Sequence, residues 1–259
     1  MNSPLLASLW EHYQIKLSLI TLFSVFAIPF LWRYLFNLIP AFANADKLNR
    51  DTFRQKMEKP AYAENQRWNR KWGLFFIVII FGGIIPFCLT PEMPVWWKLL
   101  LDCFVILMVY DFFYYLTHRF VFHQSDWFMG PLTWMHAVHH RQHNPCRNDS
   151  SFIHPLEVFI GLGLYVATIA ALTPLLGRYP VPTIVFTWLA FQHINLHNHD
   201  LWEEDRFPFK YWNYAAKMHH HHHARFTGGN YATITLLYDW MFGTLDYGTG
   251  PRKAARIKV

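Results

Sequence analysis

The sequence predicts an all-helical protein that crosses a membrane about five times and carries a cap of histidine-rich helices on one side. Of its 259 residues, 53% are hydrophobic and 15% are charged, a composition that excludes a disordered or linker-like chain. Several stretches without charged side chains approach the length of about 20 residues that a helix needs to cross a bilayer. A soluble bundle of buried helices is the weaker alternative, because it does not require several such stretches.

Five apolar runs follow one another along the chain. They cover residues 17–45, 72–91, 95–117, 158–177 and 179–199. A Pro-Glu-Met-Pro turn separates the second run from the third, and Arg178 with Pro180 separates the last two, so both pairs are predicted to form hairpins. Pro182 and the histidines of the last run leave open that this run enters the membrane only partly.

Basic residues predict the orientation of these spans. Residues 41–71 contain eight lysines and arginines, whereas the residues before Lys16 contain none. Short cytosolic connections are enriched in Lys and Arg, so we expect residues 41–71 in the cytosol and the N-terminus outside. The same threading puts the basic tail in the cytosol. The expected location is a bacterial inner membrane or the endoplasmic reticulum.

Two other kinds of chemistry are not expected. The three cysteines have neither the number nor the spacing of a disulfide framework or a zinc ribbon. The formal charge of +6 comes without any nucleic-acid-binding motif, so no nucleic-acid partner is predicted.

Ten of the 16 histidines instead form four clusters. These are His118 and His123; His136, His139 and His140; His193 and His197; and His219, His222 and His223. Spacings of three and four residues put imidazoles on one face of a helix, and neutral imidazole is the commonest side-chain ligand of transition metals. The predicted topology places all four clusters on the cytosolic side. Ten nitrogen donors suit two metal ions better than one.

His118 and His123 can face one metal site only if the helix between them is irregular. Five residues separate His118 from His123, which is a rotation of about 140° on a straight helix. We therefore expect a bulge or a helix end between them.

These clusters and their surroundings resemble the membrane-bound fatty acid hydroxylase and sterol desaturase superfamily. The clusters match its boxes HX4H, HX2HH, HX3H and HX2HH. Residues 111–119 are similar to its D-F-x-Y-Y-x-x-H-R segment, residues 152–157 to F-x-H-P-L-E, and residues 230–244 to its N-Y-G…W-D-x-x-F-G-T ending. Ala232 and Tyr238 depart from that pattern. The resemblance covers about residues 100–246, which we expect to form the catalytic region between N-terminal spans at 1–99 and a tail at 247–259.

The resemblance implies an oxygenase that uses O2 and two iron ions to act on a membrane lipid. Zinc can replace iron in a purified sample but has no accessible redox change. Hydroxylation and desaturation share such a site, and both stay open. A metal-transporting protein is a remote alternative, because it would carry its ligands at mid-membrane depth.

The electrons are expected from a separate protein of the ferredoxin, cytochrome b5 or reductase type. The sequence has no Gly-rich dinucleotide fingerprint, and the spans and clusters leave no room for a heme or flavin domain. The basic segment at residues 41–71 is predicted to bind either this acidic carrier or anionic lipid headgroups.

Three polar residues are predicted to support the ligands. Asp111 lies two helical turns before His118 and either accepts a hydrogen bond from a ligand N–H or is a carboxylate at a helix end. Asn230 and Asp239 have the same supporting role or a capping role. His154 and His199 fall outside the spacing of the clusters, and both are expected to support the ligands or to have a structural role rather than to bind metal.

Overall fold

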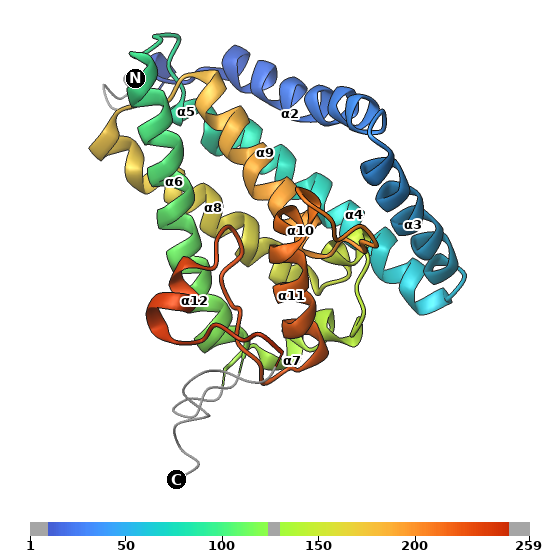
Figure 1. Cartoon of the computed structure of the whole chain (residues 1–259). Coiled ribbons are helices and arrows are strands. Elements are labelled where there is room, and N and C mark those ends of the chain that lie inside the picture. Colours follow the sequence, from blue (N-terminus) through green and yellow to red (C-terminus); the bar gives the residue numbers. More distant parts are fainter. Residues whose placement is uncertain (1–9, 124–129, 249–259) are drawn as a thin grey trace.

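The computed structural model describes residues 10–123 and 130–248, and the regular structure in these ranges is helical (Figure 1). The long helices are α2 (Ile15–Phe36), α3 (Pro40–Met57), α4 (Pro60–Ile79), α6 (Trp96–Thr117), α8 (Pro155–Leu176) and α9 (Val181–Asn198). The short ones are α5 (Ile85–Cys88), α7 (Thr133–His136), α10 (Phe209–Trp212), α11 (Tyr214–Ala224) and α12 (Leu237–Phe242). Residues 249–259 of the predicted tail lie outside the described ranges.

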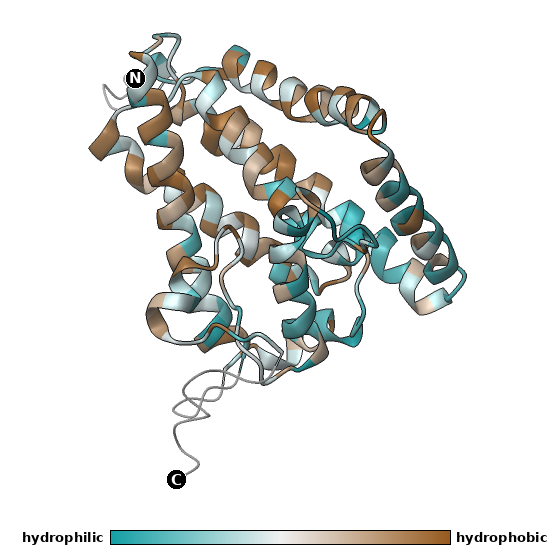
Figure 2. Cartoon of the chain, in the orientation of Figure 1, coloured by the Kyte–Doolittle hydropathy of each residue, from teal (hydrophilic) through white to brown (hydrophobic). Residues whose placement is uncertain are grey.

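The predicted multi-pass helical bundle is confirmed. Four helical segments are long and apolar enough to cross a membrane: Ile15–Phe36, Pro60–Cys88, Trp96–Phe122 and Pro155–Leu176. The fifth predicted span is α9, which packs against α2 and α6 and buries much of its length inside the bundle. Figure 2 shows apolar residues along these helices and polar residues at the end formed by α3, the first turns of α4 and α11. The chain is therefore an integral membrane protein.

The first apolar run ends earlier than the sequence indicates. Helix α2 stops at Phe36, Ile39 has an extended backbone, and Pro40 opens α3. Proline suits the first turn of a helix, where its missing N–H leaves no bond unmade. The basic segment at residues 41–71 is consequently helical, as most of α3 and the first half of α4.

Both predicted hairpins turn at the same end of the bundle. The Tyr179 N–H donates to the Cys88 carbonyl at 2.8 Å, and the Thr90 N–H donates to the Tyr179 carbonyl at 2.9 Å. Gln14, just before α2, donates from its N–H to the Pro86 carbonyl at 2.9 Å. The cluster-bearing segments lie at the opposite end (Figure 1).

Packed rings form the centre of the bundle. Tyr165 of α8 stacks on Phe191 of α9 with ring centroids 4.9 Å apart, and Tyr110 of α6 meets Phe191 edge-on at 5.2 Å. Lipid tails are as apolar as these side chains, so close packing rather than exclusion of water holds the helices together.

Asp111 ties the C-terminal segment to α6. Its buried carboxylate accepts hydrogen bonds from the backbone N–H groups of Thr233, Ile234 and Thr235 at 2.8–3.0 Å, and from the Thr235 hydroxyl at 3.0 Å. A carboxylate that receives four donors stabilises a segment that has no helical hydrogen bonds of its own.

We expect Asp111→Ala to lower the free energy of unfolding by roughly 3 kcal/mol or more, because it leaves buried backbone N–H groups without an acceptor. The melting temperature of the protein in detergent measures this loss. Asp51→Ala, a change in an exposed ion pair of α3, is the control and should change the melting temperature little. Equal melting temperatures for the two variants would contradict this role of Asp111.

The orientation gives a second expectation. Single cysteines at Glu92, between α5 and α6, and at Thr227, beyond α11, are both at exposed positions, and the native Cys88, Cys103 and Cys146 are buried. If the basic segment is cytosolic, a membrane-impermeant thiol reagent added outside intact cells labels position 92 and spares position 227. The reverse labelling pattern would refute the orientation.

Candidate metal centre

Two groups of histidines converge at the polar end of the bundle. The first comprises His118, His123, His136, His140 and His222, and the second comprises His139, His199, His219 and His223. Within each group the candidate ligand nitrogens all lie within 4.8 Å of one another. Every one of these side chains is buried except that of His219, which is half-buried.

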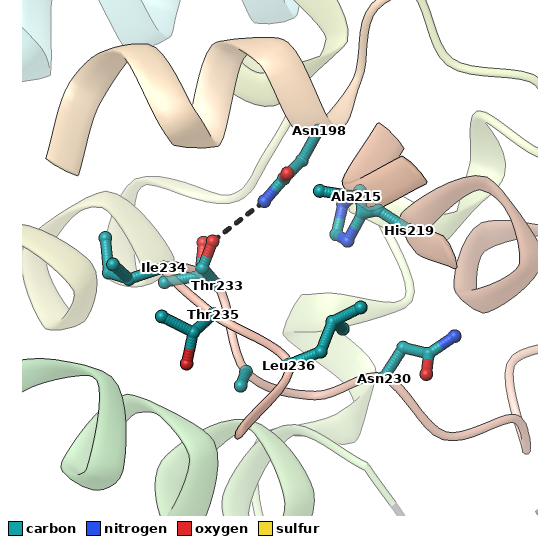
Figure 3. A pocket seen from close by; sticks show the side chains of 9 residues that line it. Asn198, Ala215, His219, Asn230, Thr233, Ile234, Thr235 and Leu236 are labelled. Carbon is teal, nitrogen blue, oxygen red and sulfur yellow. Dashed lines mark hydrogen bonds between the residues drawn. The ribbon is translucent and has the colours of Figure 1, made fainter. Parts of the chain in front are cut away.

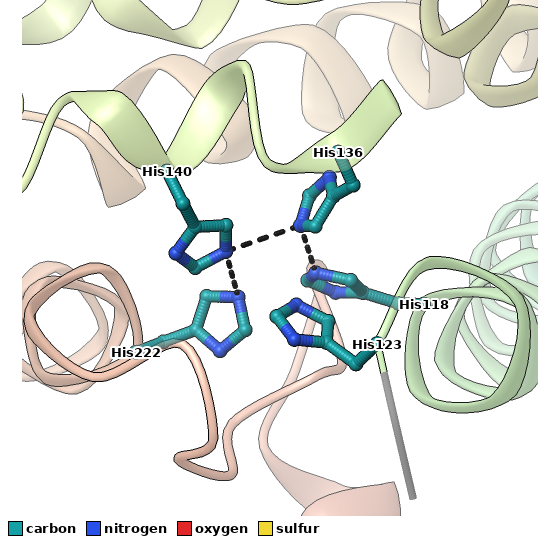
Figure 4. A group of neighbouring side chains, drawn as sticks. All are labelled: His118, His123, His136, His140 and His222. Atoms are coloured by element: carbon teal, nitrogen blue, oxygen red, sulfur yellow. Dashed lines mark hydrogen bonds between the residues drawn. The ribbon is translucent and has the colours of Figure 1, made fainter. Parts of the chain in front are cut away.

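The first group draws on three segments that are distant in sequence (Figure 4). The Nε2 atom of His136 lies 3.0 Å from Nε2 of His118 and 3.1 Å from Nε2 of His140. Nε2 of His140 lies 3.1 Å from Nε2 of His222. The rings of His118, beyond α6, of His136 and His140, around α7, and of His222, in α11, point toward one another.

A π-helical turn brings His118 and His123 into this group together. Residues His118–Phe122 extend α6 as a π-helix, and the His123 N–H donates to the His118 carbonyl at 3.0 Å across five residues. This wider turn meets the sequence expectation of a bulge or helix end. Single π-turns are frequent at functional sites.

In four of the five rings of the first group, Nδ1 has an acceptor that fixes the tautomer; Nδ1 of His140 has none among the described residues. Nδ1 of His118 lies 2.6 Å from the Tyr231 carbonyl oxygen, and Nδ1 of His136 lies 2.7 Å from Glu157 Oε1. The corresponding atoms of His123 and His222 lie 2.8 Å from the carbonyl oxygens of Phe226 and Gly229. Carbonyl and carboxylate oxygens accept, so Nδ1 carries the proton and Nε2 keeps a lone pair.

The inner nitrogens therefore need a cation. The Nε2 atoms of His118 and His136 both present lone pairs, so neither can donate across their 3.0 Å separation. With metal–nitrogen bonds of about 2.1 Å, two ligand nitrogens would lie about 3.0 Å apart for an angle of 90° at the metal and about 3.4 Å apart for the tetrahedral angle. The observed separations fit this range, and the residues present therefore suit a metal ion.

The second group is centred on His199. Its Nε2 lies 3.1 Å from Nε2 of His139, 3.1 Å from that of His219 and 3.3 Å from that of His223. Its Nδ1 lies 2.7 Å from the Asn195 carbonyl oxygen. His139 and His223 are chain neighbours of His140 and His222 in the first group, so the same two segments supply ligands to both groups.

Burial keeps these imidazoles uncharged. Desolvation lowers the pKa of His139 to about 4, and it also lowers that of His222 to about 4. The pKa values of His136, His140 and His199 lie well below the ordinary value, first through desolvation and then through repulsion from the neighbouring rings. Neutral imidazole is the form that binds metal.

The structure does not bring two of the predicted ligands to either group. His197 in α9 has Nε2 2.8 Å from the Trp212 carbonyl oxygen and Nδ1 3.3 Å from Asp200. His193 lies one turn earlier, beside the ring of Trp32 in α2. Their four-residue spacing puts both on one face of α9, and that face meets α2 and the α10 region.

His199 occupies the place that the sequence analysis assigned to the third cluster. It follows the last residue of α9, where the backbone has left the helix. A histidine beyond a helix end need not follow the spacing of three or four residues, so regular spacing does not predict it. The available signal was its position beside Asn198 and Asp200 at the end of an apolar run.

The predicted supporting residues act on the backbone next to the ligands. Asp111 does not accept from a ligand N–H; the Tyr231 carbonyl accepts from His118 instead. Asp239 accepts from the N–H groups of Tyr231 and Ala232 at 2.9 and 2.8 Å and so holds that carbonyl in place. Burial raises the pKa of Asp239 to about 6.

Asn230 has a backbone φ of 66°, which asparagine tolerates better than most residues. Its side-chain Nδ2 donates to the carbonyls of Met218 and Asp246 at 2.8 Å, and its Oδ1 accepts from the Asp246 N–H at 2.9 Å. A Cβ on the preceding Gly229 would lie 1.6 Å from the Thr244 carbonyl oxygen. Only glycine fits there, and its carbonyl accepts from His222.

A small cavity lies beside His219 of the second group (Figure 3). It has a volume of about 30 Å³, enough for one or two waters, and it is lined by His219, Asn198 and residues 232–236. The Asn198 side chain closes one wall by donating from Nδ2 to the Thr233 carbonyl at 2.9 Å.

A larger cavity of about 300 Å³ reaches from the metal centre into the bundle. His139 of the second group lines it, together with residues of α4, α6, α8 and α9. Residues of the second group and of the membrane-spanning part of the protein therefore line one cavity.

Comparisons with known proteins identify the family of the chain. The family model "Fatty acid hydroxylase" matches residues 103–244. The chain is 29% identical over 161 residues to Methylsterol monooxygenase 1 of Gallus gallus, which covers 59% of this chain and 49% of that protein. It is 26% identical over 241 residues to Methylsterol monooxygenase 1 of Rattus norvegicus, covering 86% and 73%.

A relative with a different name is Very-long-chain aldehyde decarbonylase GL1-8 of Oryza sativa subsp. indica, 26% identical over 162 residues, 60% of this chain and 56% of that protein. The matched part spans about half the length of the chicken protein and of the rice protein. No solved structure matches the chain significantly. The family model covers more than half of the chain and includes every ligand candidate of both groups, and the chain therefore belongs to the fatty acid hydroxylase family.

Proposed function

We propose that the protein is a membrane oxidoreductase that uses O2 to hydroxylate a C–H bond of a membrane lipid, with two iron ions held by nine histidines. The observation that carries this proposal is the pair of adjacent imidazole groups, of five and four members, whose Nε2 lone pairs face one another at the end of an apolar bundle.

The ligand set supports iron rather than a purely structural ion. Bound iron supplies the redox chemistry that reduces O2 and cleaves an unactivated C–H bond. Imidazoles donate no negative charge to an ion, and in both groups they come from segments that the fold holds rigidly. Zinc fits the same nitrogens but has no accessible redox change.

The position of the large cavity supports a lipid substrate. Its walls come from helices of the membrane-spanning bundle, and His139 is among the residues that line it. A long apolar chain gains about 0.8 kcal/mol for each CH2 kept out of water, so it favours a path from the bilayer over one through solvent. The relatives named as methylsterol monooxygenases are consistent with such a substrate.

Hydroxylation consumes one O2, two electrons and two protons and yields an alcohol and one water. The electrons would come from a separate carrier of the ferredoxin, cytochrome b5 or reductase type on the cytosolic side. Helix α3 is the candidate dock on that face, although Lys47 and Arg50 already pair with Asp51 and Asp46 at 3.3 and 3.2 Å. Arg33 of α2 also pairs with Asp46, at 3.2 Å, so Lys59, between α3 and α4, is among the cations available there.

The two groups predict different outcomes for two nearby histidines. His199→Ala removes the central member of the second group and should reduce iron from two ions per chain to about one, with loss of activity. His197→Ala is the matched control on the same helix end and should keep both ions. Elemental analysis of anaerobically purified protein measures the content. Loss of iron in the His197 variant but not in the His199 variant would contradict this assignment.

Isotope labelling decides the reaction. Protein reconstituted with ferrous iron, an electron donor and bilayer lipid should give a product that carries one 18O atom from 18O2. A product lighter by two hydrogens would identify a desaturase on the same ligands. Product formation without O2 would exclude both reactions. Mass spectrometry of extracted lipid distinguishes these results.

A further inference from the structure

Helix α3 contacts two chain segments that lie next to histidines of the second group. One segment is the helical turn Arg147–Ser151, and the other is Asp200 with Leu201, directly after His199. Helix α3 precedes the part of the chain, residues 103–244, that the family model matches. The second group therefore has neighbours outside the region that the chain shares with its family.

An ion pair joins these two segments. Arg147 donates from Nε to Asp200 Oδ1 at 2.6 Å and from Nη2 to Asp200 Oδ2 at 2.9 Å. The Asp200 side chain is 3% exposed, and its other hydrogen-bond contact is His197 Nδ1 at 3.3 Å. Two parallel bonds between a guanidinium and a carboxylate fix both orientation and distance. Because Asp200 follows His199 in the chain, this pair restricts the position of the His199 backbone.

Two buried side chains of α3 hold the ion pair in place. Asp46 Oδ1 accepts from Arg147 Nη1 at 3.1 Å. Asn49 Oδ1 accepts from the backbone N–H groups of Arg147 and Leu201 at 2.9 and 3.0 Å, and Asn49 Nδ2 donates to the Leu201 carbonyl at 3.0 Å. Two N–H donors at Oδ1 settle the orientation of the amide. One side chain of α3 thus sets the separation of the two segments.

Each segment bears on one ring of the second group. His199 lies where the chain leaves α9, and helix ends fray unless other contacts hold them. The turn Arg147–Ser151 leads into Phe152, whose carbonyl oxygen lies 3.3 Å from His139 Nδ1. The Nε2 atoms of His139 and His199 are 3.1 Å apart. A change in the distance between the two segments would therefore change the separation of these two nitrogens.

The first group has supports elsewhere in the chain. Its rings donate to the carbonyls of residues 226, 229 and 231 and to the Glu157 carboxylate. These acceptors belong to the segment after α11 and to the first turn of α8. A change in the pair of Arg147 and Asp200 is therefore expected to act on the second group and to spare the first.

We propose that Arg147 and Asp200, held by Asp46 and Asn49 of α3, are positioning residues that set how tightly the second histidine group binds its metal ion. The inference rests on the two-metal centre of the proposed function but not on its reaction with O2. Residues that orient metal ligands typically contribute about tenfold to hundredfold to metal affinity. A helix outside the family-matched region therefore takes part in metal binding through these contacts.

Zinc retention tests the positioning role without turnover, because zinc fits the same nitrogens and has no accessible redox change. Full-length protein produced with excess zinc is equilibrated in detergent with increasing concentrations of a chelator, and the zinc retained per chain is measured. Arg147→Lys keeps the charge but loses the two parallel bonds. One of the two ions should then leave at about a tenfold lower chelator concentration than in the wild type, and the other should be retained as before.

A double variant shows which ion is affected. His199→Ala alone should retain one ion, that of the first group. Adding Arg147→Lys to His199→Ala should leave the retention of this ion unchanged, since both changes act on the same site and their effects do not add. If Arg147 instead stabilised the histidine-bearing segments in general, the double variant would release its remaining ion at a lower chelator concentration than His199→Ala does. That result would overturn the inference.

Arg50→Lys is the matched control, because it makes the same change at a side chain of α3 that is 48% exposed and pairs with the other oxygen of Asp46 at 3.2 Å. It should retain both ions as the wild type does. Asp200→Asn removes the charge at nearly constant size and should weaken the same ion as Arg147→Lys, so it serves if the lysine variant does not fold. Circular dichroism shows that each variant is folded.

Wild-type retention of both ions in folded Arg147→Lys and Asp200→Asn would overturn the inference, and so would an equal loss in Arg50→Lys. The outcomes separate this inference from the proposed function. A chain that never holds two ions removes the two-metal centre and this inference together. A chain that holds two ions without dependence on Arg147 and Asp200 removes this inference alone. One that shows the dependence but inserts no oxygen removes only the proposed reaction.

Discussion

The structure depends on holding uncharged imidazoles with their Nε2 lone pairs facing one another. Such an arrangement is repulsive until a cation occupies it, so other contacts must stabilise it. Rings whose orientation is fixed donate a hydrogen bond from Nδ1 to an oxygen of the surrounding chain. His118, His222 and His199 donate to the carbonyls of Tyr231, Gly229 and Asn195. Burial then removes the competing proton, since it lowers the pKa of rings such as His139 to about 4.

The acceptors are mostly backbone atoms in segments without regular structure, and buried carboxylates hold those segments. Asp111 and Asp239 fix the backbone from residue 231 to residue 235, and Asp149 fixes the turn that precedes α8 through Tyr62 and Lys56. Asp239, for example, accepts from the N–H groups on both sides of the Tyr231 carbonyl and so fixes the orientation of that carbonyl. These buried acidic residues therefore hold the segments that carry the histidines, and none of them belongs to either histidine group.

Glu157 is the point at which the metal centre and the membrane-spanning cavity meet. One of its oxygens orients His136, and the side chain also lines the cavity between α4, α6, α8 and α9. Its position in the first turn of α8 explains this double contact, because that turn lies where the bundle ends and the histidine-bearing segments begin. The ring of His139, from the second group, lines the same cavity.

The sequence by itself determined the helical bundle, the approximate limits of its spans and most of the histidines that the structure brings together. Charge-free runs and regular histidine spacing are local features of the sequence. They predict which side chains share a face wherever one helix runs through them, as α11 does through His219, His222 and His223. The tertiary structure alone decided the third cluster, where His199 replaces His193 and His197. His199 lies beyond the end of α9. Its ring is held by the Asn195 carbonyl of the same helix and faces His219 of α11, and no periodicity in the sequence encodes the contact with α11.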